Sequence, residues 1–421
     1  MAIFLRLGQA IFKVQTLHKL LILKHGRRFS QVTAFVFALL FSIVFPAWGQ
    51  ELVKLGEINP LSGYLAKHGW EIHQGIQYAV EEVNARGGLA GHRVEVLSRD
   101  DRSSPEVAVN QAQDLLYREK VVGLLGGYVD SLVGPISQLA ARHRVPYVAS
   151  ASLQRALTQQ WRNPYFFRVS KLDGIIEPLS QFISQRLQAK RVAILHLATP
   201  GSTEFATEIA ACLRKAGVDI LLIEKFRPGA RDFSVFLLKV REANPDVLIS
   251  GVFFPDNLVL MRQLRERPGG LKAVIAPWGA AYHSFIEEMG PASEGVLGTC
   301  AWNPGVTLPG TENHSQAFVQ GFRLRFGEEP NTTTMHGYTS ARALLAALQK
   351  VLEKKEPLTG AAVQRELAGL DLLLPMERLK FDAYGDPQYY QHVVVQIQQG
   401  KMVVVYPPAR GTGRLRYPLD F

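Results

Sequence analysis

Cysteine is almost absent from this sequence, since Cys212 and Cys300 are the only two among 421 residues. A chain of this length can bury enough apolar surface to fold without disulfides. A disulfide and two separate thiols are both compatible with the sequence, and we expect two separate buried thiols. Paired cysteine or histidine spacings of the kind that bind metals are also missing.

The signatures of nucleotide-dependent and hydrolytic enzymes are missing as well. The sequence has no Walker motif and no nucleophile elbow, and His314 and His336 stand alone, so we expect them at the surface or in the core. The glycine-rich segment 86–91 follows an expected helix and precedes an expected strand, the reverse of the order in a phosphate loop. We therefore expect no enzyme, no catalytic residue, no metal site and no cofactor.

Acidic residues are missing from the first 49 positions, which carry six basic residues: Arg6, Lys13, Lys19, Lys24, Arg27 and Arg28. Removing these six charges leaves +4 of the formal net charge of +10 for the rest of the chain. The remaining basic residues are scattered over expected helices and form no stripe with aromatic residues. We therefore expect an ordinary solvated surface and no nucleic-acid partner.

The same N-terminal segment has the features of an export signal. Its basic stretch ends at Arg28, an apolar run of about 14 residues covers 32–45, and small residues follow at Ala47 and Gly49. The apolar run is shorter than the ~20 residues that span a bilayer, although an uncleaved anchor remains the alternative. We expect cleavage near Gly49, a periplasmic location and a mature chain that does not span the membrane.

From Gln50 onward, short apolar strands alternate with amphipathic helices. Ile72, Ile76 and Val80 recur with the helical period, and Ser104 with Pro105 marks the start of a helix. Strands are expected at 52–58, 93–98, 121–125, 145–149, 191–196, 219–224, 246–251 and 273–276, and helices include 135–143, 203–216, 233–243, 257–265 and 282–289. Two such series predict an α/β fold with two doubly wound parallel-sheet lobes.

The chain divides into five expected segments. Residues 1–49 form the signal peptide, 50–172 the first part of lobe 1, and 173–302 the first part of lobe 2. Residues 303–376 are rich in helix (312–326, 334–354 and 359–368) and are expected to return to lobe 1. Residues 377–421 cross again and add a hairpin, 393–398 with 402–406, to lobe 2. Several crossovers of this kind would form a hinge.

The ends of the expected strands carry the candidate ligand-binding residues, because parallel α/β sheets bind ligands at the carboxyl ends of their strands. Gly126 and Gly127 precede Ser131 at the start of a helix, whose free N–H groups suit a carboxylate or another anion. The other candidates found in this way are Trp70 in the first loop, Tyr128, Ser150, Ser152, Phe253 and Trp278. The alternative is that the serines cap helices or turns and that the aromatic residues belong to the core.

Several segments together resemble the type I periplasmic solute-binding proteins of ABC importers, in particular the branched-chain amino-acid group and its amide-binding relatives. They are 53–63, the helix-plus-glycine block 75–91, 100–101, 144–148, 231–233, 379–382 and 385–386, within a span of about 51–407. The resemblance implies two lobes joined by three crossovers, a monomer that closes over a small ligand, and delivery of that ligand to an ABC permease with its ATPase. A sensor that presents its ligand to a membrane receptor or kinase is the alternative.

The resemblance also implies site residues. In lobe 1 it places the ligand carboxylate on Ser131, with Asp130 as the alternative in register, and on Ala151 and Ser152. His68 falls where the family has an aromatic residue in a loop.

Lobe 2 departs from the family pattern. Gly201, beside Ser202, stands where the family has a tyrosine, while Phe253 keeps an aromatic position. Trp278 stands where amino-acid binders have the glutamate that holds the ligand ammonium, a bond worth about 1.5–3 kcal/mol. The sequence therefore argues against an ordinary α-amino acid, unless Asp130 replaces the glutamate. It favours a carboxylate or amide ligand with an apolar or aromatic body.

Overall fold

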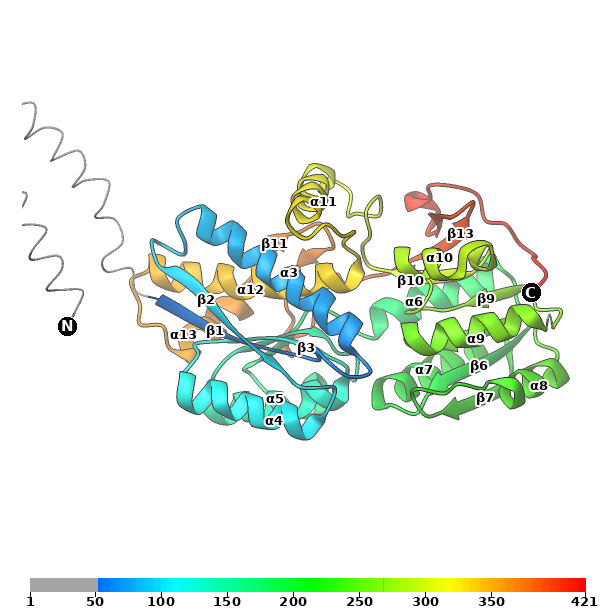
Figure 1. The fold of residues 1–421 in the computed structure, drawn as a ribbon, viewed down its shortest axis with the longest axis horizontal. Helices are drawn as coiled ribbons and strands as arrows, with labels where there is room; N and C mark the ends of the chain where they lie inside the picture. Colours follow the sequence, from blue (N-terminus) through cyan, green and yellow to red (C-terminus); the bar gives the residue numbers. More distant parts are fainter. Residues whose placement is uncertain (1–51, 268) are drawn as a thin grey trace, which may run out of the picture. The chain divides into compact units, whose positions relative to one another are not determined.

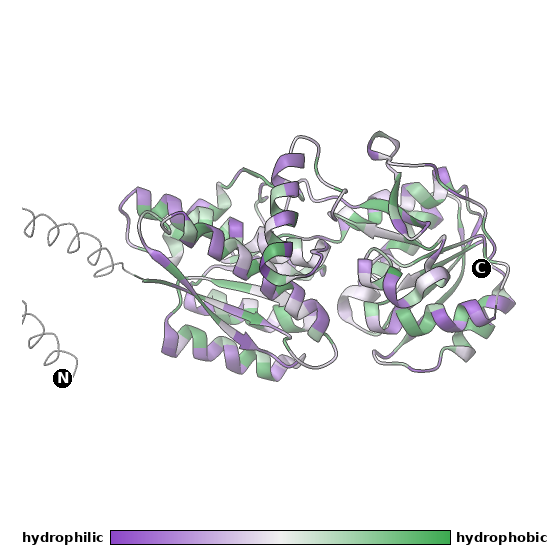
Figure 2. Ribbon diagram, turned by 45° about the horizontal axis from the view of Figure 1, so that its top comes forward, coloured by the Kyte–Doolittle hydropathy of each residue, from purple (hydrophilic) through white to green (hydrophobic). Residues whose placement is uncertain are grey.

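The computed structural model describes residues 52–267 and 269–421, so the expected signal peptide and its cleavage point lie outside the described residues. The described chain builds two α/β lobes, each around its own sheet with helices on both faces (Figure 1). The expected fold class is confirmed. Apolar residues concentrate in the strands and on the helix faces turned toward them, while polar residues cover the outer helix faces (Figure 2).

Lobe 1 contains a five-stranded parallel sheet in the order β2-β1-β3-β4-β5. Helices follow most of its strands, which is the connection that parallel strands require. The elements are β1 (Leu52–Asn59), α3 (Ala66–Ala85), β2 (Arg93–Asp100), α4 (Pro105–Gln113), β3 (Leu124–Tyr128), α5 (Asp130–His143), β4 (Tyr147–Ala151) and β5 (Phe166–Arg168).

Lobe 2 contains a seven-stranded sheet in the order β14-β13-β10-β9-β8-β6-β7, in which only β13 runs antiparallel to the other strands. The elements are α6 (Asp173–Gln181), β6 (Arg191–Leu197), α7 (Pro200–Lys215), β7 (Asp219–Phe226), α8 (Ser234–Ala243), β8 (Val247–Gly251), α9 (Phe254–Glu266), β9 (Ala273–Ile275), α10 (His283–Met289), β10 (Leu297–Cys300), β13 (Val393–Gln398) and β14 (Lys401–Tyr406).

The segment between β10 and β13 packs against lobe 1. It contains α11 (Glu312–Phe326), α12 (Thr332–Glu353), α13 (Gly360–Ala368) and the small pair β11 (Leu372–Leu373) and β12 (Arg378–Leu379). Helix α12 lies against α3 and β4. Two glycines allow the helix pair to approach this closely: a Cβ at Gly75 would lie 2.0 Å from the Thr334 carbonyl oxygen, and one at Gly337 would lie 2.2 Å from that of Ile72.

The chain passes between the lobes three times. The crossovers are 169–172 after β5, 301–311 after β10, and 380–392 after β12. Lobe 1 is therefore assembled from two stretches of sequence that are separated by most of lobe 2.

The structure differs from the expected elements at several places. The helix expected from residue 135 begins at Asp130, so Ser131 lies in its first turn. His68 and Trp70, expected in a loop, lie in α3. The short strand β5 and helix α6 were not predicted, because three residues of strand and a helix interrupted by Pro178 give little periodic signal. Cys212 and Cys300 are separate thiols, as expected, although Cys212 is only half-buried.

A buried carboxyl group lies beside the crossovers. Glu377, between β11 and β12, is 1% exposed, and neither of its carboxyl oxygens has a hydrogen-bond partner among the described residues. Burial raises the pKa of Glu377 from 4.5 to about 8, and the charge of Lys171 on the first crossover opposes this shift only in part. The folded protein therefore holds this carboxyl in its neutral form around neutral pH.

The first prediction concerns Glu377→Gln. Between the ordinary pKa of 4.5 and the folded value of about 8, the folded state binds more protons than the unfolded state. The free energy of unfolding of the native protein therefore falls as pH rises through this window. The glutamine variant lacks this contribution, so its melting temperature should exceed the native one at pH of about 8.5 and approach it at about 5. Exposed Glu287→Gln is the control, and an equal difference at both pH values would contradict the prediction.

Candidate ligand-binding site

A cavity of about 800 Å³, counting the open solvent at its mouth, lies where the carboxyl ends of strands from both lobes meet. Pockets for small ligands typically measure ~300–1,000 Å³. We call the residues that line this space the cavity wall. Lobe 1 contributes residues after β3 and β4 and from the start of α12, and lobe 2 contributes residues after β6, β8 and β9.

Most of the residues that the sequence singled out lie in the cavity wall. They are Tyr128, Asp130, Ser131, Ala151, Ser152, Ser202, Phe253 and Trp278. The structure brings these side chains together from strands of two different sheets, as the parallel-sheet rule requires.

Three of the predicted residues lie elsewhere. Ser150 is buried in β4, where its hydroxyl shares a hydrogen bond of 2.9 Å with that of Ser340. His68 is buried in α3 and stacks on the cavity-wall residue Tyr128 with ring centroids 4.6 Å apart, so it supports the wall from behind. Trp70 is 49% exposed on the outer face of α3.

The turn between β3 and α5 has an unusual backbone at the cavity wall. A Cβ at Gly127 would lie 2.2 Å from the Tyr147 hydroxyl oxygen, so only glycine fits there. Val129, the residue before α5, has φ = 67°, a region that β-branched residues rarely adopt. Its N–H donates to the Ala151 carbonyl oxygen over 3.0 Å, which holds this conformation. Such strain is typical of ligand-binding segments, and here it brings Ser131 to the wall in the first turn of α5.

Three helices of more than ten residues begin at the cavity wall without a side-chain cap: α5, α7 and α9. The first N–H groups of a helix have no partner within the helix, and they carry a partial positive charge of about half a unit. One of these N-termini belongs to lobe 1 and two belong to lobe 2. The wall therefore offers hydrogen-bond donors and positive potential from both sides.

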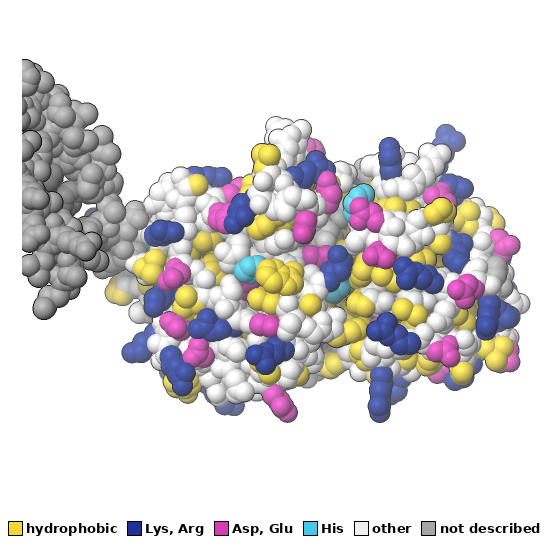
Figure 3. All heavy atoms as spheres, in the orientation of Figure 1, with side chains coloured by type: hydrophobic (Ala, Val, Ile, Leu, Met, Phe, Trp, Pro, Cys, Tyr) yellow, Lys and Arg dark blue, Asp and Glu magenta, His cyan; other side chains and the backbone are white. Residues whose placement is uncertain are grey.

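Formal charge is scarce in the cavity wall. Asp130 is the one acidic residue among the described residues of the wall, and no lysine or arginine is among them. The face shown in Figure 3 carries interspersed basic and acidic side chains. The cavity thus differs from the outer surface in having almost no charged side chains.

The Asp130 carboxylate already accepts hydrogen bonds from other residues of lobe 1. Its Oδ1 atom accepts hydrogen bonds from the N–H groups of Leu153 and Gln154, each 2.8 Å long. Its Oδ2 atom would lie 2.3 Å from a Cβ at Gly201, so the absence of a side chain at position 201 lets the two lobes approach here. Burial raises the pKa of Asp130, while the two backbone N–H groups and the charge of Arg168 oppose this. Its first role is to hold the loop after β4.

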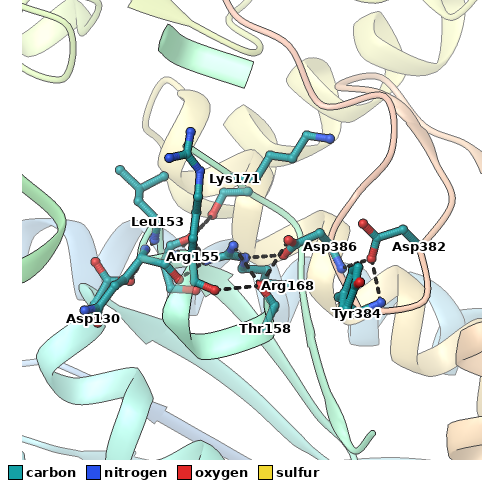
Figure 4. Close-up of polar contacts among 12 residues, drawn as sticks. Asp130, Leu153, Arg155, Thr158, Arg168, Lys171, Asp382, Tyr384 and Asp386 are labelled. Carbon is teal, nitrogen blue, oxygen red and sulfur yellow. Dashed lines mark hydrogen bonds and ion pairs between the residues drawn. The ribbon is translucent and has the colours of Figure 1, made fainter. Parts of the chain in front are cut away.

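Arg168 holds the same loop from the other side (Figure 4). Its side chain is 1% exposed, and its Nε–H donates to Asp386 on the third crossover over 2.6 Å. Its Nη1 atom donates to the carbonyl oxygens of Ser152 and Gln154 over 3.3 and 2.9 Å. The guanidinium therefore fixes the position of Ser152 at the cavity wall.

Three polar side-chain atoms at the cavity wall are enclosed and have no partner among the described residues: Ser152 Oγ, Ser202 Oγ and Trp278 Nε1. A buried donor without a partner costs about 1–3 kcal/mol. Two of these atoms lie in lobe 2 and one in lobe 1. They mark positions where a bound molecule can supply the missing hydrogen bonds.

Aromatic rings cover the part of the wall around Trp278. Its ring lies 4.6 Å from that of Phe205 and 6.2 Å from that of Phe253, centroid to centroid. Phe253 in turn lies 5.8 Å from Tyr128 of lobe 1. This series of rings across the two lobes suits an apolar or aromatic ligand body.

The sequence did not predict the residues of the wall nearest the crossovers. His336 from α12, and Tyr390 and His392 from the third crossover, lie there side by side, and each is less than a tenth exposed. His336 was expected at the surface or in the core, and nothing in the sequence connected it with residues 54 and 56 positions later. Burial lowers the pKa of both histidines to about 3, so both rings are neutral.

Two further observations concern the described residues as a whole. No helix among them is long and apolar enough to cross a bilayer. Their histidine, cysteine and acidic side chains also form no group of three or more that could hold a metal ion.

Comparison with known proteins identifies relatives along nearly the whole described chain. Residues 52–401 match the family model described as periplasmic binding protein. The Leu/Ile/Val-binding protein homolog 7 of Brucella abortus (strain 2308) is 28% identical over 392 residues, covering 87% of this chain and 94% of the relative.

Solved structures share the fold. The leucine binding protein LivK of Thermotoga maritima MSB8 superposes with a TM-score of 0.74 at 25% identity, over 84% of this chain and 97% of that one. A solute binding protein of an ABC transporter from Rhodopseudomonas palustris BisB5, in complex with 3,4-dihydroxy benzoic acid, gives 0.73 at 22% identity, over 88% and 96%. The chain therefore belongs to the periplasmic binding protein family, whose name implies a location outside the cytoplasm, and its relatives and fold are those of binding proteins and not of enzymes.

Proposed function

We propose that this chain is the periplasmic receptor of an ABC importer, which closes its lobes over a small carboxylate or amide with an apolar or aromatic body. It then delivers the ligand to a membrane permease whose ATPase supplies the energy. The observation that carries the proposal is the meeting of three uncapped helix N-termini and three unpartnered polar groups around one cavity. The receptor acts as a monomer, in keeping with the family resemblance.

The hydrogen-bond donors of the cavity wall favour a ligand that accepts hydrogen bonds. Helix N-termini attract anions and carbonyl oxygens, and Ser131 and Ser152 add hydroxyl donors at the α5 end. A carboxylate or amide oxygen placed there would be held by neutral donors alone.

The same hydrogen-bond donors disfavour a ligand ammonium in lobe 2. The indole Nε1–H of Trp278 can only donate, so it cannot replace the carboxylate of a glutamate. Asp130, the alternative partner, already accepts two backbone hydrogen bonds with its Oδ1 atom. An ammonium without a charged partner in a closed site is strongly unfavourable. Trp278 instead calls for an acceptor on the ligand.

The aromatic rings around Trp278 suit the ligand's apolar body. The relative from Rhodopseudomonas palustris shows that this fold accommodates an aromatic acid in that protein. An aromatic carboxylate would place its acid group at the α5 N-terminus and its ring among Phe253, Trp278 and Tyr128.

Side-chain contacts join the two lobes in this structure. On one side Arg155 of lobe 1 forms ion pairs with Asp173 and Glu208 of lobe 2, the latter 2.9 Å long. On another side the Tyr64 hydroxyl donates to Asp256. We call these the closure contacts. A ligand shifts the equilibrium toward closure only if it binds the closed form more tightly than the open form.

The second prediction is that Arg155→Gln opens the ligand-free protein. The variant loses both ion pairs between the lobes, so the closed form loses stability relative to the open form. Small-angle scattering should give a larger radius of gyration for the variant than for the native protein. Arg142→Gln, which removes an exposed charge from α5 of the same lobe, is the control. An unchanged radius of gyration would show that these pairs do not stabilise closure.

The third prediction concerns the ligand class. Protein freed of bound ligand by unfolding and refolding should bind aromatic or apolar carboxylates, or the corresponding amides, in calorimetric titration. Ser131→Ala combined with Ser152→Ala should weaken binding about tenfold or more, because each hydroxyl contributes ~0.5–1.5 kcal/mol. Ser180→Ala on α6 is the control. Tight binding of leucine or valine would refute the proposed ligand class.

The fourth prediction tests the donor on lobe 2. Trp278→Phe keeps an aromatic ring and removes the Nε1–H group, so affinity for the ligand identified in the titration should fall by about three- to tenfold. Trp161→Phe, a half-exposed position outside the cavity, should leave affinity unchanged. Equal affinities of the native protein and Trp278→Phe would mean that the ligand offers no acceptor to the indole.

A further inference from the structure

A chain of hydrogen bonds runs from lobe 1 to lobe 2 along the cavity wall. His336 Nε2 lies 3.0 Å from the Tyr390 hydroxyl oxygen, which lies 2.7 Å from His392 Nε2. His392 Nδ1 lies 2.9 Å from Thr299 Oγ1, whose hydroxyl donates to the Pro277 carbonyl oxygen over 3.1 Å. The chain begins on α12, passes through the third crossover and ends beside Trp278.

The last bond sets the direction of all the others. Because the Thr299 hydroxyl donates to Pro277, its oxygen accepts from His392, which must carry its proton on Nδ1. A neutral histidine then has a lone pair on Nε2, which accepts from the Tyr390 hydroxyl. The Tyr390 oxygen in turn accepts from His336 Nε2–H. This arrangement leaves the lone pair of His336 on Nδ1.

The reverse direction satisfies fewer groups. If Thr299 donated to His392 instead, every later bond would turn around, and His336 would carry an N–H on Nδ1. That N–H would have no partner among the described residues, and the hydrogen bond from Thr299 to Pro277 would be lost. The reverse direction therefore makes one hydrogen bond fewer within the chain. The first direction is therefore the more stable one.

The neutral state of both rings is part of this arrangement. His336 is 7% exposed and His392 is 4% exposed, and no acidic side chain hydrogen-bonds to either ring. A protonated ring would need a second acceptor in the chain, which the described residues do not supply. The chain can therefore act only as a fixed series of neutral donors and acceptors.

We propose that this chain makes His336 Nδ1 a neutral hydrogen-bond acceptor toward the ligand, so that the receptor selects molecules with an uncharged donor, a hydroxyl or amide N–H, at the crossover end of the cavity. The inference rests on the proposed function, since it describes the opposite end of the same ligand. It defines the ligand class more narrowly as a hydroxylated or amide-bearing acid. Tyr390, His392 and Thr299 are positioning residues that act through His336.

The fifth prediction has a spectroscopic part that needs no ligand. In long-range ¹H–¹⁵N correlation spectra of protein labelled at histidine, His336 should show the Nε2–H tautomer and His392 the Nδ1–H tautomer. His336→Gln and His392→Gln serve for assignment. If a variant fails to fold, the two rings are recognised by shifts that do not titrate across the pH range where exposed histidines do. The opposite tautomers, or a charged ring, would overturn the proposal.

The binding part compares acids that differ in one donor. Titrations with 3- and 4-hydroxybenzoate, and with the 3- and 4-fluorobenzoates that lack the donor, should show a preference of about tenfold or more for one hydroxylated acid. Tyr390→Phe removes the hydroxyl that fixes the tautomer of His336. The ratio of affinities for the hydroxylated and the fluorinated acid should therefore fall toward one. Tyr338→Phe, a buried tyrosine of α12 outside the cavity wall, should keep it.

The outcomes separate this inference from the proposed function. Equal affinity for the hydroxylated and fluorinated acids would overturn the inference and leave an acid receptor in place. If none of these acids binds, the proposed aromatic-acid ligand is wrong, and the tautomers measured without ligand still decide the direction of the chain. The tautomers predicted here, together with a donor preference lost in Tyr390→Phe, would support both.

Discussion

The buried ion pair between Arg168 and Asp386 is the interaction on which the geometry of this receptor depends. One guanidinium joins the end of β5, the carbonyl oxygens of the loop after β4, and the third crossover. Removing one partner of a buried pair typically costs about 3–5 kcal/mol, because the other charge remains without compensation. Loss of this pair would displace two parts of the cavity wall at once. The loop after β4 presents Ser152 to the cavity, and the third crossover carries Tyr390 and His392.

The cavity wall offers a ligand mainly neutral groups. The wall has helix N-termini, hydroxyls, an indole and two neutral histidines, and the described part of it has no basic side chain. Neutral donors hold an anion less tightly than a buried arginine would, because charge-assisted hydrogen bonds are roughly twice as strong. The proposed delivery to a permease requires release of the ligand, and moderate but well-directed contacts suit that role. Selectivity then comes from the match of donors and acceptors along the ligand.

The sequence predicted the fold and the part of the candidate site at the strand ends, but it did not predict the part near the crossovers. Alternating strands and helices, together with the rule that ligands bind at strand ends, were enough to predict that Ser131, Phe253 and Trp278 face the same cavity. The sequence did not predict the start of α5, because a valine such as Val129 gives no indication that its φ is positive. His336 and His392 could not be paired from sequence, since only the path of the third crossover brings them together.

The uncapped starts of α5 in one lobe and of α7 and α9 in the other have a consequence for the empty receptor. When the lobes close without a ligand, the positive ends of these helix dipoles approach each other while water leaves the cavity. A bound anion changes this repulsion into a net attraction, because it lies between the helix dipoles and is attracted by all of them. In the empty receptor this repulsion opposes the closure contacts, so the balance between the two sets how many unloaded molecules are shut.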